Sequence, residues 1–317
     1  VLADLAGEVV ATDEAGVTSE SDRPRLIHEV DAMLEAVSIP LEDVRAACVA
    51  IPGVVDPATG SIKLIPGMPA LRGDWLAAHM RNRLQCSVYI DNDIKIATEG
   101  VRSDLGHDAQ SFVFVHWGER VGAGVVIDGR LYRGTSNDSG DFGFLPLMTC
   151  AQNDDPTDRP DRSGPDHFEE WVGTDELVRL MLRVARDERD EQLVADLTGS
   201  SGRATDAALD AIAAGNRAAR GALDEIARRF ALGLVTIRAV LDPEAILIGG
   251  PMARLGEALA VEIRSHLERE TLNQPMVDVW PGTGDAILTG AIWRSLEGLF
   301  GSPERPGTMR MPTEVRL

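Results

Sequence analysis

The stretch that decides the fold is SVYIDNDIKIATEG, residues 87–100, in which an apolar run ends abruptly at Asp91, Asn92 and Asp93. In residues 87–90, Val88, Tyr89 and Ile90 are β-branched or aromatic, as in a buried strand, and the apolar residues of 94–101 recur at the spacing of one helix face. The polar side chains therefore lie at a strand-to-helix junction. In open α/β sheets, ligands bind at this end of a strand.

Two interpretations of this junction stay open. In the first, Asp91 or Asn92 caps the helix, because both residue types accept hydrogen bonds from free amide groups at a helix start. In the second, the two acids around an amide form a polar binding site. The stretch itself does not decide between them.

Strands and helices alternate along the rest of the chain, which predicts an α/β fold. We expect a strand hairpin at 1–12, strands at 46–51, 61–65, 112–117, 124–127, 245–248 and 276–280, helices at 23–37, 75–84, 251–269 and 290–299, and mostly helical sequence over 168–240. Residues 151–166, rich in Pro, Asp and Arg, are predicted to form a surface loop. A strand hairpin followed by alternating helices and strands occurs in each half of the chain, which predicts two related lobes with a cleft between them.

Composition excludes several classes of function. A formal net charge of −20 opposes direct binding to a phosphate backbone. We find no apolar run of the ~20 residues that a membrane helix needs, and no signal peptide, so we expect no membrane partner and a cytoplasmic location. The three cysteines, Cys48, Cys86 and Cys150, are unevenly spaced, so we expect free thiols rather than a disulfide framework. The chain begins at Val1 inside a strand-like run, so we expect a missing upstream segment.

Several segments, in order, resemble the ROK family of bacterial sugar kinases and sugar-responsive repressors. They are IPGVVDPATGSI (51–62), IDNDIKIA (90–97), WGERVGAGVVIDGRLYRG (117–134), SGDFGFLPL (139–147), LDPEAILIGG (241–250) and TGAIWRSLEGLF (289–300). The resemblance implies a two-lobed, actin-like (ribonuclease-H-like) ATPase and sugar kinase fold, with a sugar or sugar phosphate in the interlobe cleft, and commonly a homodimer. It implies an N-terminal lobe of 1–105 plus 290–317, lacking its first strand, and a C-terminal lobe of 106–289.

The resemblance also implies functional residues. Its sugar-binding positions fall on Asn92, Asp93, Asp141 and Glu169, with Glu170 as the alternative to Glu169. If the chain is a kinase, Asp93 is the base that deprotonates the attacking sugar hydroxyl and Mg-ATP is the phosphoryl donor. Its phosphate and nucleotide loops fall on a set of glycines, Gly118, Gly122, Gly124, Gly249 and Gly250, although a tight hairpin or a strand-to-helix turn also explains them.

The positions at which this chain departs from the family pattern argue against the binding of a nucleotide and of a metal ion. Glu119 in the phosphate loop repels a phosphate, with Arg120 beside it as a possible offset. Phe144 replaces a histidine of the family pattern, and the cysteine-rich zinc loop of the family is missing from this chain, so we expect no zinc. We therefore interpret His167 as a surface residue. Lys95 adds a cation beside Asp93. The lysine either pairs with Asp93 and weakens it as a base, or admits an acidic or phosphorylated sugar.

Three functions follow from these residues. The favoured one is the sugar-binding effector domain of a ROK-type repressor that touches DNA only through a helix-turn-helix upstream of Val1 and needs no cofactor. The alternative is an ATP-dependent hexose kinase. The third is a sugar-binding protein with neither activity.

Overall fold

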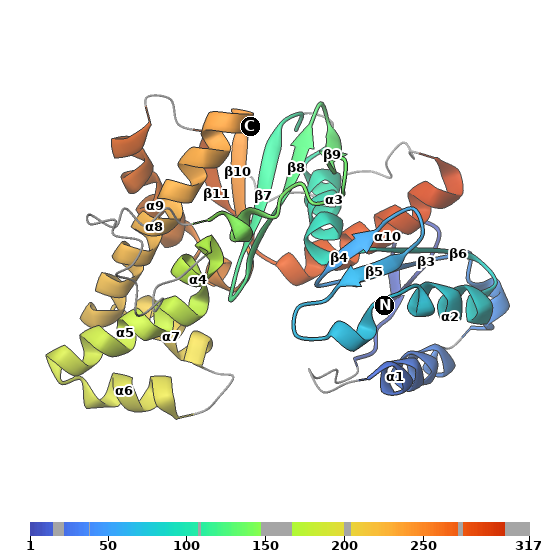
Figure 1. The fold of residues 1–317 in the computed structure, drawn as a ribbon, viewed down its shortest axis with the longest axis horizontal. Coiled ribbons are helices and arrows are strands. Elements are labelled where there is room, and N and C mark those ends of the chain that lie inside the picture. Colours follow the sequence, from blue (N-terminus) through green and yellow to red (C-terminus); the bar gives the residue numbers. More distant parts are fainter. Residues whose placement is uncertain are drawn as a thin grey trace, which may run out of the picture. The chain divides into compact units, whose positions relative to one another are not determined.

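The computed structural model describes residues 1–14, 22–37, 39–106, 109–146, 167–199, 204–271 and 275–301 (Figure 1). By its internal contacts the chain forms two compact units. The first unit comprises 1–110, 124–139 and 283–317, and the second comprises 111–123 and 140–282. The segment 124–139 and the start of the last helix thus belong to the first unit, whereas the lobe boundaries expected from the family resemblance place them in the C-terminal lobe.

The strands of the first unit form short pairs. β1 (Leu2–Ala3) and β2 (Val9–Ala11) are antiparallel, as are β4 (Val54–Asp56) and β5 (Ser61–Leu64). β3 (Ala46–Ile51) and β6 (Ser87–Asn92) are parallel, with Ile51 paired to Asn92. This register sets the end of β6 beside the turn that follows β3, where the predicted polar junction lies.

Four α-helices of the described residues belong to this unit: α1 (Arg23–Ala36), α2 (Trp75–Leu84), α3 (Asp93–Leu105) and α10 (Thr283–Phe300). In Figure 1, α3 and α10 lie side by side. A Cβ on Gly290 would lie 3.0 Å from the Gly100 amide nitrogen, so two glycines let the helices cross closely. The predicted helix 290–299 begins too late, because Gly284 and Gly290 weaken the pattern of the first turns.

The second unit has a sheet in the order β11 (Met276–Val279), β10 (Ala245–Gly249), β7 (Phe112–Trp117) and β8 (Val121–Ile127). β10 runs parallel to both β7 and β11. The end of β8 lies in the first unit, where it pairs antiparallel with β9 (Arg130–Tyr132). β8 is longer than the predicted 124–127 because it continues directly from the turn after β7.

The described helices of this unit are α4 (Phe168–Val172), α5 (Thr174–Glu188), α6 (Glu191–Thr198), α7 (Ala204–Ala213), α8 (Arg217–Leu241) and α9 (Glu257–Glu270). The rings of Trp117 on β7 and Phe230 on α8 stack with centroids 3.7 Å apart, which fixes α8 against the sheet. The predicted helix 251–269 is interrupted: a 3₁₀ turn at Pro251–Leu255 ends at Gly256, whose φ of +56° breaks the helical path before α9.

Within the described part of the chain, every helix is too short or too polar to cross a membrane. Cys48 and Cys86 are free thiols, and burial raises the pKa of Cys48 to about 12. Cys150 and the predicted loop 151–166 lie outside the described residues.

Candidate sugar and phosphate sites

Asn92, at the end of β6, is the helix cap that the sequence left undecided. Its side-chain oxygen accepts from the amides of Ile94 at 3.0 Å and Lys95 at 3.1 Å. Its Nδ2 donates to the carbonyl of Gly53 at 3.1 Å, in the turn after β3. Capping fixes the orientation of the side chain, and an amide has two N–H groups, so Asn92 keeps a second donor for a ligand.

Asp93 is the first residue of α3, and its carboxylate accepts from the amide of Ile94 at 2.9 Å. Burial raises the pKa of Asp93 to about 6, against the lowering effects of backbone hydrogen bonds and of the Lys95 charge. At neutral pH the side chain is therefore largely a carboxylate with a high proton affinity. Such a group accepts a hydrogen bond from a hydroxyl and is also suited to act as a base.

A buried polar network lies behind this junction in the first unit. Asp91, 4% exposed, accepts from Arg133 at 2.6 Å, and Arg133 also donates to the side-chain oxygen of Asn137 at 3.1 Å. Asn137 Nδ2 donates to the carbonyl of Val55 at 2.9 Å, and Lys95 Nζ donates to the Asn137 carbonyl at 2.6 Å. The network ties the loop after β9 to the ends of β4 and β6, so Asp91 is an ion-pair partner rather than the cap.

The sequence interpretation missed Arg133 and Asn137. Arg133 lies in the LYRG part of a segment that resembles the family, and Asn137 lies in a polar turn. The residue type of Asn137 is a weak signal, because Asn tolerates positive φ better than most residues, and the φ of Asn137 is +66°. The network also sharpens the prediction for Lys95, whose ammonium is buried and hydrogen-bonded to a backbone carbonyl while its charge acts on Asp93.

Glu169, on α4 in the second unit, contacts the loop between β7 and β8. Its Oε1 lies 3.1 Å from Arg120 Nη1, and its Oε2 accepts from the amide of Val121 at 3.4 Å. A Cβ on Gly143 would lie 2.7 Å from Glu169 Oε2, so the glycine leaves room for this approach. The alternative, Glu170, is exposed and lies 3.8 Å from His167 Nδ1. Glu169 is thus the acid that reaches the loop.

Asp141 lies in the same unit, directly before the 3₁₀ turn Phe142–Phe144, and its side chain is exposed. Its carbonyl accepts from the amide of Phe144 at 3.2 Å. The structure therefore groups Asn92 with Asp93 in the first unit, and describes Asp141 and Glu169 separately in the second. A common sugar site for all four stays a prediction.

Three predicted phosphate-loop glycines gather at one edge of the second unit's sheet. Gly118 follows β7, and Gly249 ends β10 beside His116 of β7. Gly250 has a φ of +85°, and a Cβ there would lie 2.6 Å from the carbonyl oxygen of Trp117. Backbone at this edge is thus close-packed, and a Cβ on Gly118 would lie 3.2 Å from both His116 Nε2 and Pro251 Cδ. The edge lies at the carboxyl ends of parallel strands, where ligands bind in α/β sheets.

The other two glycines differ. Gly122 lies on β8 and is half-buried. Gly124 is also on β8, where a Cβ would overlap the side chain of Thr98 on α3, so packing alone explains this glycine. Glu119 is exposed in the turn between the strands, and Arg120 pairs with Glu169. The loop therefore presents an acid whose neighbouring cation is already paired.

The family's zinc position can be tested at Phe144 and His167. The Phe144 ring meets the His167 ring edge-on at 5.9 Å between centroids, and a phenyl ring offers a metal no donor atom. His167 pairs loosely with Glu170. The described residues here do not fit the family's zinc site, and residues 147–166 lie outside the description.

Comparison with known proteins identifies the family to which this chain is similar. A sequence model described as the ROK family matches residues 1–161. The chain is 22% identical over 321 residues to a xylose repressor of Caldicellulosiruptor bescii, covering 96% of this chain and 76% of the repressor. It is 24% identical over 292 residues to a beta-glucoside kinase of Listeria monocytogenes, covering 92% of this chain and 91% of the kinase.

Among solved structures, the chain resembles a ROK family glucokinase from Streptomyces griseus in complex with glucose and AMPPNP. The TM-score is 0.72 at 22% identity, and the match covers 89% of this chain and 91% of the glucokinase. The fold is therefore the actin-like, ribonuclease-H-like fold of this group, as the sequence predicted. Relatives of both kinds, repressors and kinases, match at similar identity.

Proposed function

The chain belongs to the ROK family, and on that premise we propose that it is the sugar-binding effector domain of a transcriptional regulator of carbohydrate metabolism. Asn92 and Asp93 are the proposed sugar contacts. Asn92 offers an N–H donor from a side chain locked by its capping bonds, and Asp93 offers a half-buried carboxylate acceptor one residue further on. A donor and an acceptor held rigidly side by side suit two neighbouring hydroxyls of a sugar.

The observation that carries the choice of regulator over kinase is the pairing of Arg120 with Glu169. Phosphoryl transfer depends on positioning the phosphates and stabilising their charge. In this chain the turn after β7 presents Glu119, and its neighbouring guanidinium is neutralised by a carboxylate at 3.1 Å. Among the described residues of that turn, 118–120, a nucleotide phosphate meets the acid Glu119 beside a cation that is already paired.

Two parts of the proposal rest on the family resemblance. Asp141 and Glu169 are proposed as further sugar contacts. DNA contact would need a separate basic helix-turn-helix, since the −20 charge of this chain opposes phosphate binding, and a homodimer would pair two such heads.

The second candidate is a hexose kinase, and the raised pKa of Asp93 favours it. A carboxylate with a pKa of about 6 is closer to the optimum of a general base at neutral pH than an ordinary aspartate. The relatives named beta-glucoside kinase and glucokinase are consistent with that role.

Hexose-dependent release of ADP from Mg-ATP separates the two candidates. The assay compares the wild-type chain with Asp93→Asn across a panel of hexoses, with sugar binding measured in parallel by calorimetry. Sugar binding without ADP release supports the regulator. Hexose-dependent ADP release that falls by about 10²-fold or more in Asp93→Asn would identify the kinase and overturn the proposal.

A further inference from the structure

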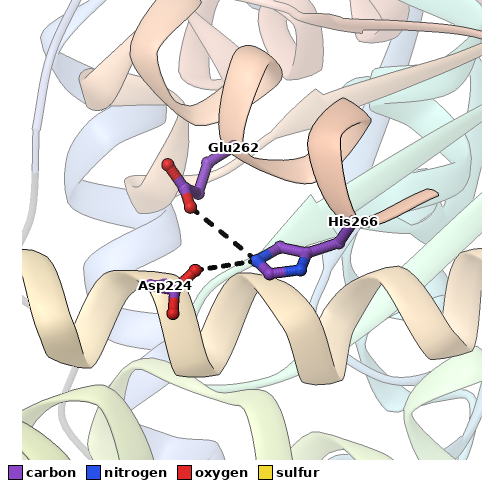
Figure 2. A group of neighbouring side chains, drawn as sticks. All are labelled: Asp224, Glu262 and His266. Carbon is purple, nitrogen blue, oxygen red and sulfur yellow. Dashed lines mark hydrogen bonds and ion pairs between the residues drawn. The ribbon is translucent and has the colours of Figure 1, made fainter. Parts of the chain in front are cut away.

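A group of metal-ligating side chains lies in the second unit, between α8 and α9. Figure 2 shows one imidazole nitrogen of His266 facing two carboxylates, those of Asp224 and Glu262. His266 Nε2 lies 3.0 Å from Asp224 Oδ1 and 3.7 Å from Glu262 Oε1. One ligand atom of each residue lies within 4.8 Å of those of the other two. The group shares no residue with the proposed sugar and phosphate sites.

Helix geometry brings the donors together. Glu262 and His266 are separated by four residues on α9, so their side chains lie on one face, one turn apart. Asp224 comes from α8, which packs against that face of α9. Two rigid helices therefore hold the donors, which is the setting in which metal ligands keep their geometry best.

The separations fit one bound ion. With metal–nitrogen and metal–oxygen bonds of about 2.1 Å, adjacent ligand atoms lie roughly 3.0–3.4 Å apart in octahedral or tetrahedral geometry. The His266–Asp224 distance already has this length. The remaining gaps close by rotation of the outer carboxylates, because the side chain of Asp224 is 63% exposed and that of Glu262 is 33% exposed.

The charges of the group favour a cation. Asp224 and Glu262 place two carboxylates beside one imidazole nitrogen, and a dication bound there offsets the repulsion between the two negative charges. The charge of Arg269 also acts on Glu262 and opposes the ion, although the donor set remains two acids and an imidazole.

We propose that Asp224, Glu262 and His266 bind a divalent transition-metal ion that links α8 to α9. One imidazole nitrogen and two carboxylate oxygens suit Zn²⁺, Co²⁺ or Mn²⁺, whereas Mg²⁺ and Ca²⁺ prefer all-oxygen sites. The buried imidazole is the fixed ligand, and the exposed side of the two acids leaves coordination positions for water. The site goes beyond the proposed function and differs in place and donors from the zinc loop of the family.

The competing interpretation is an ion pair, in which a protonated His266 bridges the two acids and no metal is involved. It predicts that added metal changes nothing, whereas the metal site predicts that binding stabilises the folded protein by mass action. The two are therefore distinguished by unfolding temperature.

The test is thermal unfolding of the full chain, stripped with a chelator and then titrated with ZnCl₂, CoCl₂ or MgCl₂. We expect saturating Zn²⁺ or Co²⁺ to raise the Tm by about 3–6 °C, and Mg²⁺ at the same concentration to leave it unchanged. Asp224→Asn removes one exposed ligand at almost constant shape. It should weaken Zn²⁺ binding about tenfold or more. His266→Gln should do the same and abolish the visible absorption of bound Co²⁺.

The matched control is Glu268→Gln, which removes an exposed carboxylate from the same helix α9 and should leave the metal-induced shift intact. Absence of a shift in the wild-type chain overturns the site. A Zn²⁺ affinity in Asp224→Asn equal to that of the wild-type chain also overturns it, because the ion then binds elsewhere. Asp224 lies on the surface, so that variant stays informative if His266→Gln fails to fold.

Discussion

The guanidinium of Arg120 lies 3.1 Å from the carboxylate of Glu169, which also accepts from the amide of Val121 at 3.4 Å. One acid thus neutralises the cation of the turn after β7 and holds the turn in place. The same glutamate is the residue that the family resemblance assigns to the sugar. The proposed sugar contact and the charge of the turn therefore involve the same side chain, Glu169 in the second unit.

Freeing Arg120 should restore some affinity for nucleotide. Glu169→Gln removes the ion pair, so Arg120 is released to offset Glu119, and Mg-AMPPNP should bind about two- to fivefold more tightly than to the wild-type chain. Calorimetric titration measures this. Glu170→Gln is the matched control, because that neighbouring acid pairs with His167 instead. Equal nucleotide affinity in Glu169→Gln and wild type would show that the pair does not govern the loop.

Asp93 should make the protein less stable as pH rises through the acid range. Its pKa is about 6 in the folded protein against an ordinary value of 3.8. Between these values the unfolded chain has lost a proton that the folded protein keeps, so the free energy of unfolding falls by roughly 2–3 kcal/mol from about pH 4 to about pH 6. Asp93→Asn should remove this fall and be more stable at pH 7. Urea unfolding at a series of pH values measures it, and identical pH profiles would contradict the assignment.

Lys95 should set how far the Asp93 pKa rises. Its positive charge lowers the pKa of Asp93 against the larger effect of burial, so Lys95→Met should move that pKa above about 6. Titration of the Asp93 carboxyl by NMR reads the change directly. Lys63→Met, which removes an exposed lysine of the same unit, should leave the Asp93 pKa where it is. An Asp93 pKa unchanged by Lys95→Met contradicts the electrostatic coupling.

The crossing of α3 and α10 should tolerate no side chain at its centre. A Cβ at Gly290 meets the backbone of Ile96 and Gly100, so Gly290→Ala should cost about 2–4 kcal/mol of the free energy of unfolding. Gly284→Ala on the same helix is the control, since no atom lies within 4 Å of its added methyl group, and it should be neutral or slightly stabilising. Chemical denaturation compares them, and equal stabilities of the two variants would refute the close crossing.

Much of this architecture follows from local pattern. The strand 46–51, the helix 75–84 and the strand 112–117 are confirmed at their predicted bounds, because each is an uninterrupted pattern bounded by turn residues. The last helix was predicted too short, since Gly290 is a weak helix former whose value lies in a tertiary contact with α3.

The candidate site also has features that local sequence predicts and features that it does not. The position of Asn92 and Asp93 at a strand-to-helix junction follows from the run of residues 87–101. Whether Asp91 or Asn92 caps the helix depends on backbone direction, and the structure assigns that role to Asn92. The contacts of Asp91 with Arg133 and of Lys95 with Asn137 each join residues about 40 positions apart, and no local sequence pattern predicts them. The order of the blocks predicted the family and fold, but the choice between regulator and kinase depends on ligands.

The most direct test of the account is calorimetric titration of the wild-type chain and Asn92→Ala with a panel of monosaccharides. Asn216→Ala serves as the control, because Asn216 is the N-cap of α8 and is not a proposed sugar contact. Each variant loses one N-cap, so each should lose a similar amount of stability, about 1 kcal/mol. We predict that one or more sugars bind the wild-type chain and Asn216→Ala alike, and bind Asn92→Ala at least about tenfold more weakly. Failure of every sugar to bind, or equal affinity in Asn92→Ala, would contradict the assignment of the sugar site.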